Sequence, residues 1–166
     1  DDFLRTGNID FTATDKVSLF AGVRKLSDAN RAVLVELGTN GVNTFLIQAP
    51  TVAGGVNFAF TSGASLLKSD SVGNMVAPIS AVLTAKADIQ SSYVGLIANG
   101  GINTPVISDQ GIGNYQNAPI YIGRRAGTTL AFNGHIYGLI GIGKLVSDTA
   151  TIEKELAKRV GVTLNV

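Results

Sequence analysis

Apolar and polar residues alternate along most of the chain, which is the period of a β-strand with one buried face. The pattern is clearest from Lys16 to Arg24 and from Val56 to Thr61, where every second residue is apolar. Gly, Asn, Ser and Pro interrupt it every 8–12 residues or so, as turns do. The alternation predicts about ten short strands, at residues 8–11, 16–24, 32–37, 44–49, 56–61, 80–86, 92–98, 104–108, 120–124 and 135–143.

The connections between these strands carry turn signals of different strength. Asn40-Gly41 is a strong hairpin signal and predicts that residues 32–37 and 44–49 pair antiparallel, with Glu36 pointing outward. Residues 62–78 are less regular and predict a loop with one edge strand. The stretch from Asn117 to Ser147 holds two strand patterns joined by a Gly- and Asn-rich link, and we expect those two strands to form a β-hairpin.

After Ser147 the period changes to that of a helix. Ile152, Leu156 and Val160 recur at every fourth residue, with charged side chains on the other face. We expect a C-terminal helix over residues 148–160, capped by Ser147 or Asp148 and followed by Gly161 as the C′ residue. The pattern as a whole predicts an all-β fold, an antiparallel two-sheet jelly-roll sandwich with this one helix packed on it.

Composition narrows the class of protein. A chain of 166 residues is expected to form a single domain, residues 1–166, and the absence of cysteine excludes disulfides and thiolate metal sites. A net charge of +1 with scattered Lys and Arg argues against a nucleic-acid partner, and no apolar run approaches the roughly 20 residues of a membrane span. Because Asp1 is not a start methionine, we expect the chain to be a fragment of a longer one. With only 15% charged residues, it suits a module tethered in an assembly.

Sequence motifs for catalysis or nucleotide binding fail on inspection. Gly138 to Lys144 resembles a P-loop, but Leu145 stands where a magnesium-binding hydroxyl is required, and the glycines lie within a strand pattern. Gly111 and Gly113 lack the third glycine of a dinucleotide site. His135 is the one histidine, and no nucleophile motif accompanies it. Dispersed acidic residues could form a glycosidase pair only in three dimensions.

Oxygen ligands for calcium are the remaining metal chemistry to consider. Asp70, Asp88 or Asp109 could contribute to a loop site, but the sequence holds no D-x-D loop. We therefore expect no metal and no cofactor.

A polar loop before residues 120–124 is the candidate ligand site. Sugar-binding surfaces combine an aromatic platform with fixed amides and charges, and the chain has no Trp to serve as that platform. The candidate ligand-binding residues are Asp109, Asn114, Tyr115, Asn117, Arg124 and Arg125. The alternative is that Tyr115 packs beneath the loop and that the arginines form a solvated strand end.

Several segments also carry a family resemblance. Ile120 to Arg124, Phe132 to Ile136 and the Leu145-x-Ser147 helix start resemble the closing half of laminin G-like, concanavalin A-like jelly-roll domains. Asp109 to Tyr115, taken with residues 11–38, resembles more narrowly the lectin-like domains at the ends of bacteriophage and prophage tail proteins. The likeness extends over about residues 11–164.

The resemblance implies two face-to-face sheets and a virion or tail-fibre protein, extracellular after release, that recognises host-surface glycans without catalysis. Its expected partners are a bacterial surface glycan, other virion proteins and further copies of itself. The calcium ligands of some laminin G and pentraxin relatives match no residues here. Because the same fold serves many roles, two alternatives stay open: a structural module that decorates or links the virion, and a glycosidase on the same scaffold.

Overall fold

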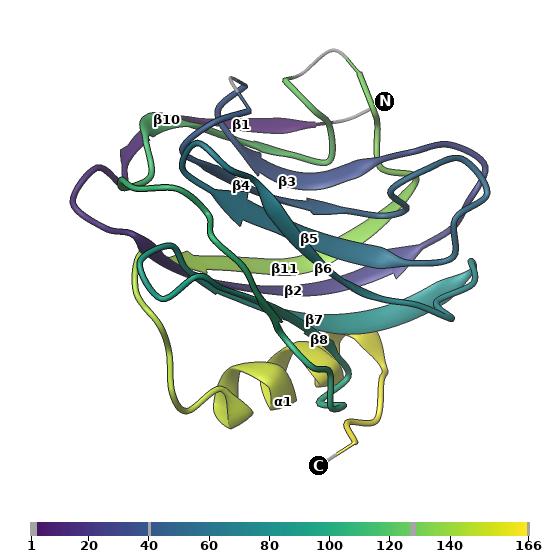
Figure 1. Cartoon of the computed structure of the whole chain (residues 1–166). Helices are drawn as coiled ribbons and strands as arrows, with labels where there is room; N and C mark the ends of the chain where they lie inside the picture. The colour runs from purple at the N-terminus through teal and green to yellow at the C-terminus, as the bar shows by residue number, and fades with distance from the viewer. Residues whose placement is uncertain (1–2, 40, 127–128, 166) are drawn as a thin grey trace.

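Two stacked antiparallel sheets and one helix make up the fold, with the helix against the outer face of the second sheet (Figure 1). This computed structural model describes residues 3–39, 41–126 and 129–165. The elements in chain order are β1 Leu4–Asp10, β2 Lys16–Lys25, β3 Val33–Leu37, β4 Thr44–Gln48, β5 Phe58–Gly63, β6 Lys68–Val72, β7 Ile79–Asp88, β8 Tyr93–Ala98, β9 Val106–Ile107, β10 Asn117–Ile122, β11 Gly134–Ile142 and α1 Ala150–Val160.

The strand order confirms the predicted jelly-roll sandwich. Among the described residues, sheet A has the order β1-β10-β3-β4-β5-β6 and sheet B the order β11-β2-β7-β8-β9. Every neighbouring pair is antiparallel. The irregular residues 62–78 supply β6, an edge strand, as the sequence predicts. Asn40 of the predicted hairpin signal lies outside the described residues, but β3 and β4 do pair antiparallel.

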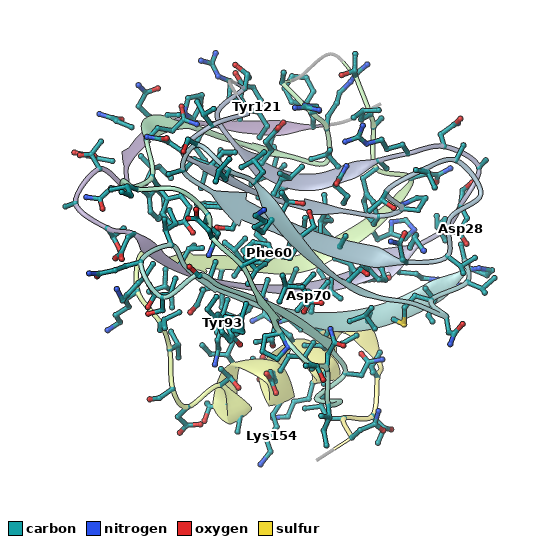
Figure 2. The ribbon with its side chains drawn as sticks, viewed as in Figure 1. Asp28, Phe60, Asp70, Tyr93, Tyr121 and Lys154 are labelled. Atoms are coloured by element: carbon teal, nitrogen blue, oxygen red, sulfur yellow. The ribbon has the colours of Figure 1, made fainter. Side chains whose placement is uncertain are left out.

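The core lies between the sheets and is built from the inward face of each alternating strand. Phe45, Phe58 and Phe60 of sheet A and Leu19 and Leu83 of sheet B are fully buried there; Phe60 is labelled in Figure 2. Burying side chains of this size is worth roughly 1.5–3 kcal/mol each, which is why the period-2 pattern decides the fold. Loops at both ends of such a rigid sandwich can then carry function.

Helix α1 is amphipathic, and its apolar face covers β2 and β7. Leu156 and Ala157 pack on Phe20 and Val82, which point away from the main core. The N-cap is Thr149, without a side-chain capping bond, so the predicted cap at Ser147 or Asp148 is wrong by one residue or more. Asp148 still contributes, because its Oδ1 accepts a hydrogen bond from the Ala150 amide at 3.2 Å.

Glycines in sheet B allow the helix to approach. A Cβ atom at Gly138 would lie 2.7 Å from Leu156 Cδ2, and one at Gly22 would lie 2.7 Å from Val160 Cγ2. Gly138 also follows a register shift in β11. Gly138, in the run that resembles a P-loop, therefore serves close packing, and Lys144 follows a strand instead of opening a helix.

Gly138→Ala is expected to destabilise the domain by about 1–3 kcal/mol, because the added methyl group overpacks the helix contact. Gly7→Ala in β1 is the matched control, since a Cβ at Gly7 has nothing within 4 Å and the change should be nearly neutral. Urea denaturation of the two variants measures the difference. Equal stabilities for both would contradict the packing role.

The expected hairpin between residues 120–124 and 135–143 is wrong. β10 pairs with β1 and β3 in sheet A, whereas β11 pairs with β2 in sheet B. The chain therefore leaves sheet A after Ile122 and has entered sheet B at Gly134. Each of the two strands buries its apolar face against the same core. Because a strand in either sheet would show the same alternation, the pattern does not distinguish a hairpin from a crossover between sheets.

Glu36 in β3 points away from the core between the sheets, as predicted, since its neighbours Val35 and Leu37 belong to that core and it does not, but it is covered instead of solvated. Its side chain is 1% exposed and pairs with Arg125, whose Nε lies 3.2 Å from Glu36 Oε1. Burial raises the pKa of Glu36, and the nearby charges of Arg125 and Arg31 offset part of that rise. Among the residues that the structure describes, no helix is both long and apolar enough to cross a membrane.

Candidate functional site

Three connections meet at one end of the sandwich. Lys16 at the start of β2 pairs with Asp88 at the end of β7, so the β1–β2 and β7–β8 turns share that end. Tyr93 pairs with Ile107, and Asn117 pairs with Asp10, which brings the β9–β10 loop to the same place. The fold thus gathers segments that are far apart in sequence.

These connections border a surface hollow of about 590 Å³. We call it the loop hollow. Its lining residues are Asp15, Ile89, Gln90, Ser92, Asp109, Gly111, Ile112, Gly113 and Asn114. A hollow of this size can hold a small ligand or one or two sugar rings.

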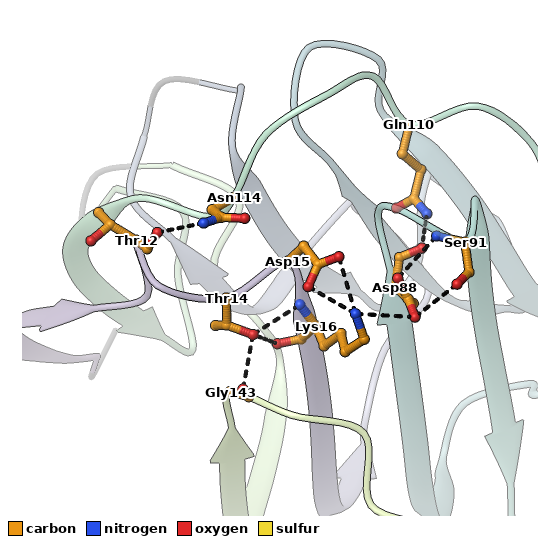
Figure 3. Close-up of polar contacts among 9 residues, drawn as sticks. All are labelled: Thr12, Thr14, Asp15, Lys16, Asp88, Ser91, Gln110, Asn114 and Gly143. Atoms are coloured by element: carbon orange, nitrogen blue, oxygen red, sulfur yellow. Dashed lines mark hydrogen bonds and ion pairs between the residues drawn. The ribbon is translucent and has the colours of Figure 1, made fainter.

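An ion pair fixes the carboxylate of Asp15 at the edge of the loop hollow (Figure 3). Lys16 Nζ lies 2.9 Å from Asp15 Oδ1 and 3.5 Å from Asp88 Oδ2. Burial acts to raise the pKa of Asp15, but the hydrogen bond and charge of Lys16, together with hydrogen bonds from the backbone of Asp15 and Gln90, outweigh it and hold that pKa below its ordinary value. The same contacts raise the pKa of Lys16. Asp15 therefore presents an ionised, oriented hydrogen-bond acceptor at neutral pH.

The β9–β10 loop is held by its own polar side chains. Asp109 Oδ1 accepts a hydrogen bond from the Gly111 amide at 2.8 Å. Asn114 Nδ2 donates to the Thr12 carbonyl at 2.6 Å, as Figure 3 shows. Gly111 has φ +82°, and a Cβ there would lie 2.9 Å from the Ser65 amide nitrogen. The glycines that fail as a nucleotide motif are thus needed for the path of this loop.

Apolar surface complements the polar groups. Ile89 is buried beneath the loop hollow, while Ile112 at its rim is 99% exposed. Ser92 and the exposed Gln90 add a hydroxyl and an amide from the β7–β8 turn. This combination offers hydrogen bonds to ligand hydroxyls with an aliphatic contact beside them.

Tyr115 is not the exposed platform that the site hypothesis requires. Its side chain is 1% exposed, and its ring meets Phe45 edge to face with centroids 5.4 Å apart. Its hydroxyl lies 2.7 Å from Ser62 Oγ. This geometry corrects the ligand-binding assignment of Tyr115 and supports the alternative in which it packs beneath the loop.

The six predicted site residues do not form one cluster. Asp109 and Asn114 line the loop hollow. Asn117 is exposed at the start of β10 but lies outside the lining, so its role stays a prediction. Arg124 and Arg125 follow the other end of β10, where Arg125 binds the buried Glu36 instead of contributing to the loop hollow.

Sequence reasoning missed the residues of the β1–β2 and β7–β8 turns, Asp15, Gln90 and Ser92. Asp15 directly precedes the predicted strand 16–24, Gln90 lies between the predicted strands 80–86 and 92–98, and Ser92 begins the latter, but only the sheet order shows that the two turns meet. The sequence marks these three residues as polar residues in or beside turns but does not indicate that they lie close together.

The acidic residues considered for calcium are separated in the structure. Asp70 accepts hydrogen bonds from the Leu96 amide at 2.8 Å and from Asn103 Nδ2 at 3.0 Å, which ties β6 to β8. Asp88 is bonded to Lys16 and Ser91, and Asp109 to its own loop. Within the described ranges, no group of three or more His, Cys, Asp or Glu side chains is arranged to hold a metal ion.

Comparisons with known proteins agree with this architecture. No family model matches the sequence, and no curated relative does. The structure is similar to the CBM40 of the Ruminococcus gnavus IT-sialidase, solved with α2,3-sialyllactose bound, with a TM-score of 0.62 and 15% identity over 96% of this chain and 98% of that chain.

Two further similar structures come from animals. A heptameric SAP-like pentraxin from Limulus polyphemus gives a TM-score of 0.65 at 9% identity, covering 93% of this chain and 73% of that chain. Domains LG4-5 of the mouse laminin α1 chain give 0.63 at 9% identity, covering 87% and 40%. These likenesses establish the concanavalin A-like, laminin G-like fold.

Proposed function

We propose that this domain is a non-enzymatic carbohydrate-binding module whose ligand occupies the loop hollow. The observation that carries the proposal is the arrangement of Asp15, Gln90, Asp109 and Asn114 around a hollow on rigid strand ends, with Ile112 exposed beside them. Oriented carboxylates and amides next to an aliphatic surface suit a ligand that has many hydroxyls and apolar C–H faces. The similarity to a CBM40 solved with sialyllactose supports the same class of ligand.

The electrostatics of Asp15 suit binding of sugar hydroxyls and not the acid step of hydrolysis. A glycosidase requires a carboxyl group whose pKa is raised so that it can protonate the leaving oxygen. The pKa of Asp15 is instead lowered, because Lys16 and two backbone hydrogen bonds together outweigh the effect of burial. Asp15 is therefore a hydrogen-bond acceptor for sugar hydroxyls and not a general acid.

The biological setting that we propose is the exterior of a phage virion or tail, where the module would recognise a bacterial surface glycan. This part of the proposal rests on the sequence resemblance to phage and prophage tail domains. A shallow site of this kind gives weak single-site affinity, and several copies in one particle would supply avidity. The alternative is a structural module that decorates or links the virion.

A glycan array that includes bacterial polysaccharides, probed with multivalent domain, tests the proposal. Selective binding is expected. A folded domain that binds no glycan on the array would overturn the proposal and favour the structural alternative.

Gln90→Ala is expected to weaken binding of the selected glycan roughly three- to tenfold, since it removes one exposed hydrogen-bonding amide from the loop hollow. Its control is Asn30→Ala, which removes an exposed amide in the β2–β3 connection at the opposite end of the sandwich. Isothermal titration with both variants is the measurement. An affinity unchanged by Gln90→Ala would indicate that the glycan binds outside the loop hollow.

A further inference from the structure

A second hollow adjoins the loop hollow on the outer face of sheet B. It has a volume of about 390 Å³ and lies between the end of β7, the start of β8 and the segment that leads into α1. We call it the Tyr93 groove, and its principal lining residues are Lys86, Asp88, Ser91, Tyr93, Leu145 and Val146. We propose that the Tyr93 groove binds an acidic sugar residue of the same glycan that occupies the loop hollow, an inference that rests on the proposed function.

Tyr93 supplies the aromatic surface that Tyr115 does not. Its side chain is half-buried and lies along β8 over Gly95: a Cβ at Gly95 would be 2.6 Å from the Tyr93 hydroxyl and 3.0 Å from its Cζ. The ring also borders a smaller hollow on the side of Asn103 and Pro105, so it stands as a wall between two surface depressions. In Figure 2 it lies on the helix side of the sandwich, at the end opposite Asp28.

Apolar side chains continue the surface next to the ring. Leu145 is 40% exposed, and Val146 packs partly against the helix cluster. The Val146 amide donates to Ser18 Oγ at 3.0 Å, and Ser18 Oγ donates to the Lys144 carbonyl at 2.9 Å, which fixes this segment on the sheet. A sugar ring can lay its C–H face on a fixed aromatic and aliphatic surface of this kind.

Lys86 gives the Tyr93 groove a positive charge that is available to a ligand. It borders the groove and the smaller hollow, and it forms no ion pair with any residue that the structure describes. The neighbouring carboxylate of Asp88 is already engaged, by Lys16 at 3.5 Å and by the Ser91 amide and hydroxyl at 3.0 Å each. A partly buried lysine side chain whose charge has no ion-pair partner among the described residues favours an anionic ligand, such as a sugar carboxylate.

The β7–β8 turn joins the two hollows. Gln90 and Ser92 line the loop hollow, while Ser91 and Tyr93 line the Tyr93 groove. Lys16 bridges Asp15 of the loop hollow and Asp88 of the groove, as Figure 3 shows. An oligosaccharide that crosses this turn can therefore place one residue in each hollow, and we infer that the ligand class is an acidic oligosaccharide.

The test compares pairs of acidic and neutral oligosaccharides of equal length by isothermal titration: hyaluronan hexasaccharide with chitohexaose, and 3′-sialyllactose with the neutral trisaccharide 3′-galactosyllactose. The domain is expected to prefer the acidic member of at least one pair about tenfold, with a preference that falls as salt is raised. Lys86→Met should abolish this preference and leave affinity for the neutral member within about twofold, while Lys86→Arg should retain it. Lys68→Met, which removes a half-buried lysine of sheet A, should have no effect.

Tyr93→Leu should weaken binding of both members of a pair roughly fivefold through loss of the ring, and Tyr93→Phe should bind nearly as wild type. Thermal melts ensure that each variant is folded at the titration temperature. Equal affinity for acidic and neutral members, or a preference that survives Lys86→Met, would overturn the inference. If Gln90→Ala still weakened glycan binding in that case, the proposed function at the loop hollow would hold and only the role of the Tyr93 groove would be rejected. A folded wild-type domain that binds neither member of any pair, nor the array, would overturn both.

Discussion

Tyr115→Ala is expected to destabilise the domain by roughly 3–5 kcal/mol, the range for removing a large buried aromatic side chain. Tyr115 is 1% exposed and belongs to an edge-to-face series in which Phe45 meets both Tyr115 and Phe11. Truncation leaves a cavity in the core and also leaves Ser62 Oγ without its partner. Urea denaturation at 25 °C measures the loss, with the folded fraction followed by circular dichroism.

Tyr115→Phe separates the two contributions. It keeps the ring and removes only the hydroxyl, so the expected loss is about 1 kcal/mol from the unpaired Ser62. Glycan affinity measured on the folded fraction should be unchanged in both variants, because the side chain does not reach the loop hollow. A Tyr115→Ala variant of near wild-type stability that loses glycan affinity would restore the tyrosine as a ligand contact.

The contrast between Tyr115 and Tyr93 shows what the sequence could and could not provide. Both tyrosines stand next to polar residues in sequence, and local composition gives them the same appearance. Burial of Tyr115 results from the crossing of its loop over β4 and β5, where Phe45 and Ser62 are located. Tyr93 begins a strand whose outer face extends beyond the cover of α1. Only tertiary contacts distinguish the two.

The positions of the strands were predictable because the alternation of apolar and polar residues lies within each strand. The alternation in β2 and β7 and the four-residue period of α1 each follow from a single element meeting the core. Sheet membership is not local, which is why β10 and β11 were expected to pair with each other and in fact belong to different sheets. The same limit applies to the loop hollow, since Asp15 and Asp109 meet only through the pairing of β2 with β7 and of β8 with β9.

Asp28→Asn is the second substitution with a large expected effect, roughly 3–5 kcal/mol, because it leaves a buried lysine without its counter-ion. Lys25 is fully buried at the end of β2, with its Nζ 2.6 Å from Asp28 Oδ1 and 4.9 Å from the centroid of the Phe58 ring. Asparagine retains an oxygen that can accept the Ala77 amide hydrogen bond, which Asp28 Oδ2 accepts at 2.7 Å. The loss of stability is therefore assigned to the charge. Urea denaturation at pH 7 is the measurement.

Lys25→Met completes a double-mutant cycle. Combined with Asp28→Asn it removes both charges and fills the site with an unbranched apolar side chain, so the double variant should recover much of the stability that Asp28→Asn loses. Losses that simply add in the double variant would show that the two side chains act independently.

The same pair predicts a dependence of stability on pH. Burial acts to raise the pKa of Asp28, but the hydrogen bond from the Ala77 amide and the contact with Lys25 outweigh it, so the pKa in the folded state lies below the ordinary value of 3.8. A lowered carboxyl pKa contributes stability that is fully present above pH 3.8 and is lost as the pH falls through the folded-state value. The free energy of unfolding of the wild type should therefore fall more steeply between pH 5 and pH 2, roughly, than that of Asp28→Asn. Parallel curves for the two proteins over this range would mean that the Lys25–Asp28 contact contributes no net stability, and the large loss expected for Asp28→Asn at pH 7 should then be absent as well.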